Sequence, residues 1–240
     1  AAPAFGLTVD TNHALYSDMV GIYVFEGPSG SGDNLVGTGT MVGTVEDADG
    51  FDGPTQSHQD WYNDFGTGYT FCIWHDGMTL GSWNAILIIT DSTIVWQRDS
   101  SNDRARCTHV STRCDLYNLN MADIASPQML TLRWSGTKVY AYENDTLIDS
   151  AALAKPPKTD SSTSTLSVCT ACTVRRLYIF NTDIGIDAIS ALYADPDSIF
   201  SNPPAKATSP SPSDGAVDVD LTSLLTWTAS GETYDVWFAA

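Results

Sequence analysis

The sequence predicts an all-β antiparallel sandwich that ends in one short helix. The chain has 240 residues, 42% of them hydrophobic and 10% aromatic, which is enough to bury a sizeable core. Glutamate and lysine are rare, whereas aspartate, threonine, serine and glycine are abundant, and this composition favours strands and turns over helix faces. Short apolar segments recur about every ten residues, as in a β-sandwich.

Apolar or alternating runs bounded by turn residues mark the predicted strands. Ser135-Gly136-Thr137 and Asn144-Asp145 predict tight turns between three of them. Residues 46–68 are polar and are expected to form a long loop. The predicted strands are Met19–Phe25, Leu35–Val45, Tyr69–Trp74, Trp83–Ile89, Thr93–Arg98, Arg106–Thr112, Met129–Trp134, Lys138–Glu143, Thr146–Asp149, Leu166–Val168 and Thr173–Phe180.

The apolar period changes after the last of these strands. Ile189, Leu192 and Tyr193 fall at i, i+3 and i+4, which predicts one buried face of a short helix. Asp195-Pro196 should end this helix, because proline cannot continue it and restricts the residue before it. The helix therefore closes the main body of the chain near Phe200.

Four segments follow from these patterns: an N-terminal arm at 1–12, the main sandwich at 13–200, a Pro/Ser-rich linker at 201–213 and a new β pattern at 214–240. The last segment resembles the opening strands of a fibronectin-III or bacterial Ig-like domain, in DGAVDVDLTSLLTW and YDVWF. Such a domain needs about 90–100 residues. We therefore expect the natural chain to continue, or a partner to cover these strands.

The charge balance argues against whole classes of partner. The formal net charge of −18 disfavours nucleic acid and anionic membrane surfaces, and no basic stripe offsets it. No apolar run approaches the length of a membrane span, so we expect no membrane insertion. The first residues, AAPAFG, lack the charged and apolar regions of a signal peptide, so none is expected.

The five cysteines divide into one buried residue and two close pairs. Cys72 sits in an apolar strand and should be a buried thiol. The disulfide candidates are Cys107, Cys114, Cys169 and Cys172. A zinc site built from the same four cysteines, with His109 as a spare ligand, is an alternative, although the first pair is more widely spaced than in a zinc knuckle. Plain thiols are the third possibility.

Catalytic patterns are missing from the sequence. A glycosidase needs two carboxylates across the sugar, yet no two glutamates lie close together on a predicted strand. No Gly-x-Ser-x-Gly precedes a helix, and the histidines His13, His58, His75 and His109 are scattered, as surface or hydrogen-bonded residues are. We therefore expect a protein that is not an enzyme and that needs no cofactor other than a candidate calcium ion.

Two loop clusters are candidate binding sites. Asp47, Asp49 and Asp52 could supply oxygen ligands to calcium, although the spacing is not that of an EF-hand. An aromatic and polar cluster suits sugar binding, in which a ring stacks on the pyranose and short polar groups orient its hydroxyls. The glycan-binding candidates are Asp60, Trp61, Tyr62, Asn63 and Asp64. Either Trp61 or Phe65 could instead plug the end of the core.

The strand aromatics carry a second set of expectations. Trp74, Trp96 and Trp134 alternate within strands and should be core residues. Tyr140 and Tyr142 share one face of a strand, so that face either is buried or lines a concave binding surface.

Four segments in register resemble one known family. They are HALYSDMVGIYVF, YTFCIW, MLTLRWSGTKVYAYENDTLID and RRLYIFNTDIGIDAISALYADPDSIF. Together, residues 13–200 resemble the laminin-G-like, concanavalin-A-like jelly-roll family. The resemblance implies an antiparallel jelly-roll β-sandwich with one short C-terminal helix, in which calcium often binds at the rim of a sheet.

The ending LYADPDSIF is similar to a variant of this family found in tailed-phage and gene-transfer-agent virion proteins. That resemblance implies a non-enzymatic module for capsid decoration, fibre or tail adhesion, located on the virion surface and oligomeric in an assembly. Its partners would be other virion proteins and host-surface polysaccharide. The alternative is a secreted or cell-surface bacterial carbohydrate-binding module, and a glycan hydrolase or lyase ranks last.

Overall fold

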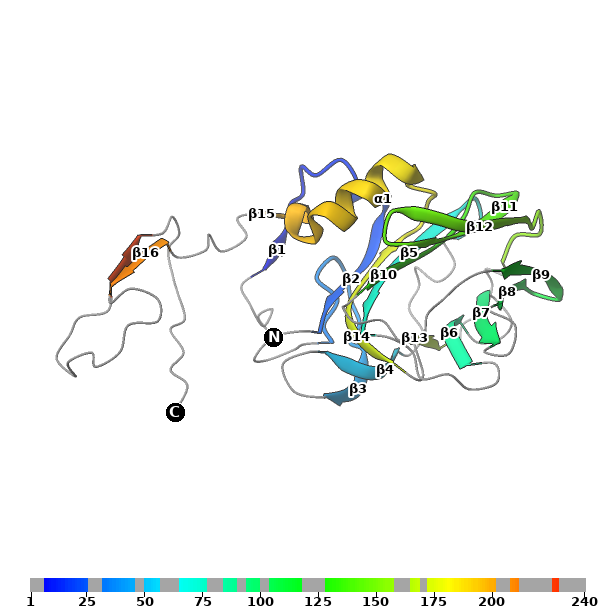
Figure 1. Cartoon of the computed structure of the whole chain (residues 1–240), viewed down its shortest axis with the longest axis horizontal. Coiled ribbons are helices and arrows are strands. Elements are labelled where there is room, and N and C mark those ends of the chain that lie inside the picture. Colours follow the sequence, from blue (N-terminus) through cyan, green and yellow to red (C-terminus); the bar gives the residue numbers. More distant parts are fainter. Residues whose placement is uncertain are drawn as a thin grey trace.

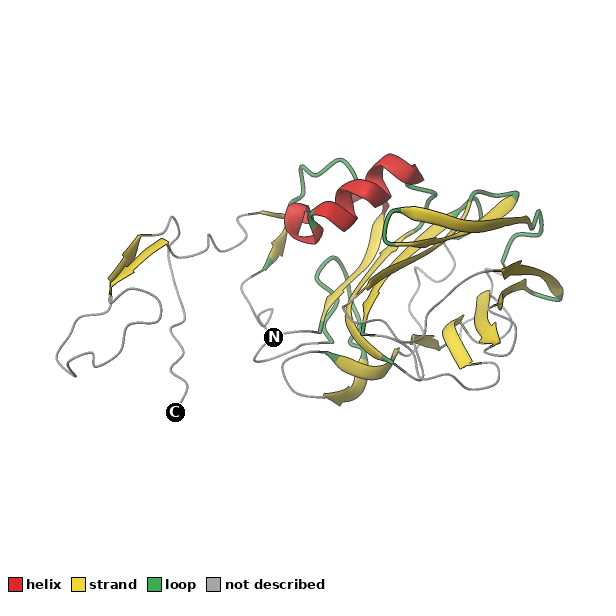
Figure 2. Cartoon of the chain, viewed as in Figure 1, coloured by secondary structure: helices red, strands yellow, loops and turns green. Residues whose placement is uncertain are grey.

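The chain folds as an all-β jelly-roll sandwich with one short helix (Figures 1 and 2). Within the described residues, strands form one continuous 13-stranded ladder that folds over into two layers. The computed structural model describes residues 7–25, 32–45, 50–56, 65–76, 84–89, 94–99, 104–117, 128–157, 165–168, 172–201, 208–211 and 226–228.

The first layer carries the helix on its outer side and is antiparallel throughout. In spatial order it contains β12 (Thr146–Ala152), β11 (Lys138–Glu143), β10 (Gln128–Trp134), β5 (Tyr69–His75), β14 (Thr173–Phe180) and β2 (Met19–Val24). The second layer contains β3 (Val42–Val45), β4 (Phe51–Gln56), β13 (Leu166–Val168), β6 (Asn84–Ile89), β7 (Ile94–Asp99), β8 (Arg104–His109) and β9 (Thr112–Tyr117).

The two layers are joined at one corner and meet again at the opposite side. The corner is the short pairing of β14 with β4, at Thr173 and Val174. At the far ends of the ladder, β9 and β12 lie beside each other, and the Tyr117 N–H donates to Asp149 Oδ2 at 2.7 Å. The side chains between the layers form the main core, in which Trp96 and Trp134 are buried as predicted.

The outer face of the first layer has a core of its own. Helix α1 (Gly185–Ala194) buries Ile189 and Leu192 against residues of β5 and β14, including Trp74 and Tyr178. Figure 1 shows α1 lying over this side of the sandwich. Strand β5 and residues 177–180 of β14 are therefore buried on both faces, which explains why these stretches of sequence are almost continuously apolar. No described helix is long and apolar enough to cross a membrane.

The helix prediction is confirmed except for one residue. The α-helix ends at Ala194, and Asp195 leaves the helical conformation before the 3₁₀ turn η4 (Pro196–Ile199). Tyr193 was expected on the buried face, but its side chain is 42% exposed. In a helix of ten residues the buried arc is narrow, and it includes Leu192 rather than its neighbour.

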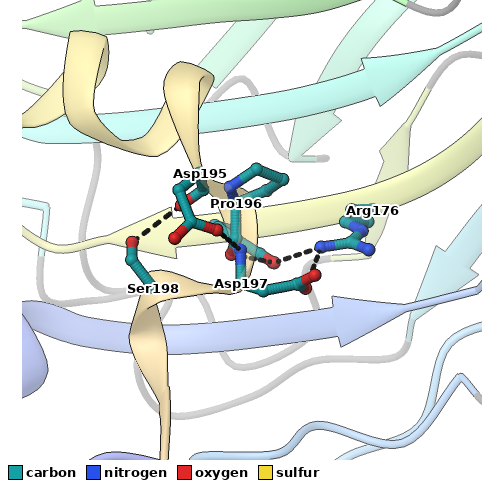
Figure 3. A network of polar contacts seen from close by, with 6 residues as sticks. Arg176, Asp195, Pro196, Asp197 and Ser198 are labelled. Atoms are coloured by element: carbon teal, nitrogen blue, oxygen red, sulfur yellow. Dashed lines mark hydrogen bonds and ion pairs between the residues drawn. The ribbon is translucent and has the colours of Figure 1, made fainter. Parts of the chain in front are cut away.

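A polar clasp fastens the end of the helix to β14 (Figure 3). Arg176 Nη1 lies 2.6 Å from Asp197 Oδ1, and the Tyr178 hydroxyl donates to the Pro196 carbonyl at 3.0 Å. Asp195 Oδ1 accepts from the Asp197 N–H at 3.1 Å, while the Ser198 hydroxyl donates to the Asp195 carbonyl at 2.7 Å. The residues LYADPDSIF thus act structurally: they end the helix and hold the turn on the sheet.

The residues that follow the clasp pair with the N-terminal strand. Strand β15 (Phe200–Ser201) follows η4 directly and pairs antiparallel with β1 (Thr8–Val9), which is separated from β2 by the 3₁₀ turn η1 (Tyr16–Asp18). Val9 and Phe200 join the outer core beside α1. The segment 1–12, expected to be an arm, therefore docks on the sandwich through residues 8–9.

The C-terminal part contains a small sheet of its own. Strand β16 (Thr208–Ser211) pairs antiparallel with β17 (Thr226–Thr228). Strand β16 falls inside the segment 201–213 that was expected to be a linker, so β pairing begins before residue 214. The Ig-like character of residues 214–240 stays a prediction, since most of them lie outside the described residues.

Most predicted strands lie where the sequence places them, and the clearest miss is β4. Its sequence, FDGPTQ, lies in the expected polar loop and has no apolar alternation. The ladder with β3 shifts register between Val42 and Thr44, opposite Gly53-Pro54, so proline sits at an irregularity where it is tolerated. Gly50 has φ 150°, and an added Cβ would lie 2.4 Å from the Val174 carbonyl oxygen. Tertiary pairing therefore makes this strand. Of Leu35–Val45, only Val42–Val45 is a strand, and the predicted strand at Arg106–Thr112 is a hairpin of β8 and β9.

We predict that Arg176→Leu loosens the helix and the termini together. The change leaves the Asp197 carboxylate without its cation, and a lost hydrogen bond to a charged group costs about 1.5–3 kcal/mol. Thermal unfolding should shift down by roughly 3–10 °C, and amide exchange should accelerate over residues 185–201. Arg106→Leu, which removes the Arg106–Asp115 ion pair in the β8–β9 hairpin, is the control. Unchanged exchange in α1 would contradict the role of the clasp.

Candidate functional site

The loop clusters predicted as binding sites lie almost wholly outside the described residues. This applies to the glycan-binding candidates Asp60, Trp61, Tyr62, Asn63 and Asp64, and to Asp47 and Asp49 of the calcium candidate. Asp52 is placed only by its backbone, in β4. Phe65 is fully buried in the main core against Tyr69 and Phe71, which is the core-plug role considered for it. Both loop sites stay predictions.

A cluster on the outer face of β10, β11 and β12 is the best-defined surface site among the described residues. We call it the tyrosine platform, and it consists of Arg133, Lys138, Tyr140, Tyr142 and Ser150. Arg133 and Ser150 are the register partners of Tyr140 on its two sides, so these residues share one face. The Tyr140 and Tyr142 rings are stacked with centroids 6.5 Å apart.

Two cations lie against the half-buried ring of Tyr140. The Arg133 guanidinium carbon is 4.2 Å from the Tyr140 ring centroid and 5.7 Å from that of Tyr142. The Lys138 ammonium is 5.9 Å from the Tyr140 centroid, on an exposed side chain that has no carboxylate partner among the described residues. Cations over aromatic faces at these distances are held by the ring quadrupole.

Arg133 is fixed in place by the loop that begins α1. Its Nε lies 3.2 Å from Asp183 Oδ1, and Asp183 also accepts the Gly185 N–H at 3.1 Å. Arg133 Nε is buried and makes no hydrogen bond within the described residues, so the Asp183 contact is an ion pair without hydrogen-bond geometry. Arg133 is thereby neutralised, whereas Lys138 adds an uncompensated positive charge to the platform.

The platform lies at the margin of the outer core. Tyr142 is buried in the outer core, and Tyr140 is half-buried at its margin. Leu147, the register partner of Tyr142, is 49% exposed. Burial raises the pKa of Tyr142, so its hydroxyl stays protonated. The strand face is thus buried at Tyr142 and half-buried at Tyr140, and the expectation that it lines a concave binding surface stays a prediction.

A polar chain crosses the main core between the layers. The Trp96 indole N–H donates to the Tyr69 hydroxyl at 3.1 Å, and that hydroxyl lies 2.8 Å from His109 Nε2. His109 Nδ1 lies 2.8 Å from the Lys155 carbonyl, which can only accept, so Nδ1 carries the proton and Tyr69 donates to Nε2. All three side chains are fully buried, and their hydrogen bonds align β5, β7 and β8.

The described cysteines are free thiols, and their placement is uneven. Cys72 is fully buried, as expected for its apolar strand. Cys107 and Cys114 are direct register partners in the β8–β9 hairpin, and Cys172 is buried at the start of β14. Cys169 lies outside the described residues. Among described residues, no three His, Cys, Asp or Glu side chains converge as metal ligands; since Cys169 lies outside them, the zinc alternative stays a prediction.

No protein-family model matches the chain, and a comparison with curated proteins finds no match. Solved structures do match. The binding domain of botulinum neurotoxin DC in complex with SialylT has a TM-score of 0.56 at 11% identity, covering 75% of this chain and 52% of that one. The receptor binding domain of the botulinum neurotoxin C/D mosaic serotype has a TM-score of 0.56 at 9% identity, with 75% and 51% covered.

A sialidase shares the architecture as well. Trypanosoma rangeli sialidase in complex with 2,3-difluorosialic acid has a TM-score of 0.52 at 10% identity, covering 76% of this chain and 34% of that one. The chain spans about half the length of the neurotoxin domains and about a third of the sialidase. At these identities the similarity shows the fold, a β-sandwich used by binding domains and present in an enzyme.

The two buried histidines predict a pH-dependent stability. Burial lowers the pKa of His75 and of His109 to about 4 each, from an ordinary 6.5. The unfolded chain therefore binds protons below pH 6.5 that the folded chain takes up only near pH 4. The free energy of unfolding should fall across this window, by up to about 1.4 kcal/mol per pH unit for each histidine, and should level off above pH 7.

Chemical denaturation between pH 4 and pH 8 measures this slope. His109→Gln keeps an amide that can donate to Lys155 and accept from Tyr69, so this variant should lose about half of the pH dependence. A free energy of unfolding that stays flat from pH 7 to pH 5 would contradict the burial of both neutral rings.

Proposed function

We propose that this chain is a non-catalytic carbohydrate-binding module that holds its ligand on the tyrosine platform. The observation that carries the proposal is the half-exposed Tyr140 ring between Arg133, Lys138 and Ser150, at the margin of the outer core. An aromatic ring stacks on the C–H face of a pyranose, and neighbouring donors orient its hydroxyl groups. Tyr140, Ser150 and Lys138 supply these elements on adjacent strands of a rigid sheet.

The charge of the platform favours sugars that carry a carboxylate. Lys138 offers an ammonium that no described carboxylate neutralises, and Arg133 places a guanidinium on the same ring. A ligand carboxylate beside Lys138 gains a charge-assisted hydrogen bond. The overall net charge of −18 works against anionic ligands, so this preference depends on the local placement of Lys138.

The matching structures support a binding role without fixing it. One is a neurotoxin binding domain in complex with SialylT, and another is a neurotoxin described as dependent for cell entry upon interaction with two ganglioside molecules. A sialidase also matches, so glycan hydrolysis by this chain has to be measured. A purified chain that hydrolyses a glycan, with the activity removed by an aspartate substitution, would replace the binding proposal.

We predict that the platform binds 3′-sialyllactose more tightly than lactose. Tyr140→Ala should weaken binding of both by about 5–10-fold, since stacking on an aromatic ring contributes about 1 kcal/mol or more. Lys138→Glu should weaken binding of sialyllactose more than binding of lactose, because it reverses the free charge as well as removing a donor. Titration calorimetry with each sugar measures both effects, and Tyr193→Ala and Arg113→Glu are the matched controls for an exposed tyrosine and an exposed cation.

The outcomes distinguish the preference for a carboxylate from binding at the platform itself. Equal affinity for both sugars would remove the carboxylate preference and leave the platform. Binding that survives Tyr140→Ala, or that falls as far in Tyr193→Ala, would exclude the platform as the binding site. The loop candidates Trp61 and Tyr62 would then remain.

We further propose that the module is carried on a phage-like virion as a decoration, fibre or tail adhesion element, in a laminin-G-like jelly-roll. The support is the resemblance of LYADPDSIF to virion modules. Its partners would be other virion proteins and host-surface polysaccharide. Mass spectrometry of purified particles tests this, and recovery of the chain only as a free secreted or cell-wall protein would favour the alternative carbohydrate-binding module.

A further inference from the structure

The β8–β9 hairpin holds two thiols directly opposite each other. Cys107 and Cys114 are register partners, so their side chains project from the same face of the hairpin. Directly opposed residues in an antiparallel pair have Cα atoms about 4.5–5.5 Å apart, which lies within the range of about 4.4–6.8 Å that a disulfide requires. Cys107 is part of the main core, and Cys114 packs against it.

The two thiols differ in access and in reactivity. Cys107 is fully buried, and burial raises its pKa well above the ordinary value. Cys114 is half-buried, and the hydrogen bond from Cys107 lowers its pKa. A thiolate attacks a disulfide, whereas a thiol does not. Cys114 is therefore the thiol that a soluble oxidant meets first, with Cys107 positioned behind it to resolve the product.

A cross-link in this hairpin would stabilise both its turn and its edge strand. Its two-residue turn places Val110 at φ 57°, a left-handed conformation that is costly for a β-branched residue. Strand β9 is an edge strand, paired only with β8 among the described strands, and its last residue is held across the seam by Asp149. The ladder between β8 and β9 thus has to maintain a strained turn and one border of the sandwich.

We propose that Cys107 and Cys114 form a cross-strand disulfide by exchange with a small-molecule disulfide, and that this bond locks the β9 border. The Cys114 thiolate attacks one sulfur of the oxidant, forms a mixed disulfide and releases one thiolate. The thiolate released in this first step takes the proton of Cys107, which then attacks Cys114 Sγ and releases the second thiolate. Two protein thiols are oxidised to one disulfide, and one small disulfide is reduced to two thiols.

Oxidised glutathione tests the proposal on the full chain. The expected product has lost two hydrogens and has two thiols fewer than the starting chain, and a non-reducing digest joins the peptides that contain Cys107 and Cys114. Closing this short loop should raise Tm by roughly 5–10 °C, and dithiothreitol should reverse the rise. The rate of oxidation should reach its plateau at a lower pH than that of an ordinary thiol, because the reacting thiolate is Cys114.

Two variants identify the role of each thiol. Cys107→Ala should stop the reaction at one glutathione adduct on Cys114, and Cys114→Ala should leave Cys107 unmodified. A stable mixed disulfide at Cys114 of the unaltered chain, or a digest that links either residue to Cys169 or Cys172, would overturn the proposal. So would an unreacted Cys114. The wild-type digest decides the matter even if a variant fails to fold.

Discussion

The structure depends on burying both faces of β5 and β14. Their inner faces pack against the second layer across Tyr69, Phe71, Leu177 and Ile179, and their outer faces pack under α1. A strand that is apolar on both sides has no face for water, so the outer layer has to be supplied by the chain itself. Helix α1 fills that role only if it is held in register with the sheet.

The clasp at Arg176 holds the helix in place on the sheet through an ion pair. Arg176 is on the outer face of β14, and its partner Asp197 belongs to the turn after the helix, so one ion pair ties a strand to the element that covers it. Residue 200 then pairs with the N-terminal strand β1. The nine residues LYADPDSIF therefore have a sufficient structural explanation, and any functional reading of them rests on resemblance alone.

The sequence predicted the elements that the local residue pattern determines. It missed those that depend on pairing or packing with distant parts of the chain. Strand β11 is recognisable by its alternation and by the turn residues on either side of it: Gly136 has φ 88° in the turn after β10, and Asn144, in the turn before β12, has a φ of 58° that asparagine tolerates. Strand β4 carries a Gly53-Pro54 irregularity and gains strand geometry from three neighbours. Tyr193 was misplaced because a ten-residue helix buries only a narrow arc.

The candidate site shows the same division. Shared orientation of Tyr140 and Tyr142 follows from the two-residue period of a strand, but which of the two is buried depends on where the outer core ends. The same period places Lys138 on that face, but the Arg133 contact could not be foreseen, since Arg133 reaches the ring from β10 and pairs with Asp183, fifty residues further along the chain. Likewise, Tyr69 and His109 meet only because the two layers close over each other.

The contact between β9 and β12 also places the Cys107–Cys114 pair and the tyrosine platform on connected parts of the fold. Strand β12 carries Ser150 on its outer side, and its Asp149 holds Tyr117 at the end of β9. The border that a Cys107–Cys114 bond would lock is therefore the border on which one side of the tyrosine platform stands. Since edge strands are the least constrained strands of a sheet, rigidity at β9 favours a fixed β12 and, through it, a platform already arranged before its ligand arrives.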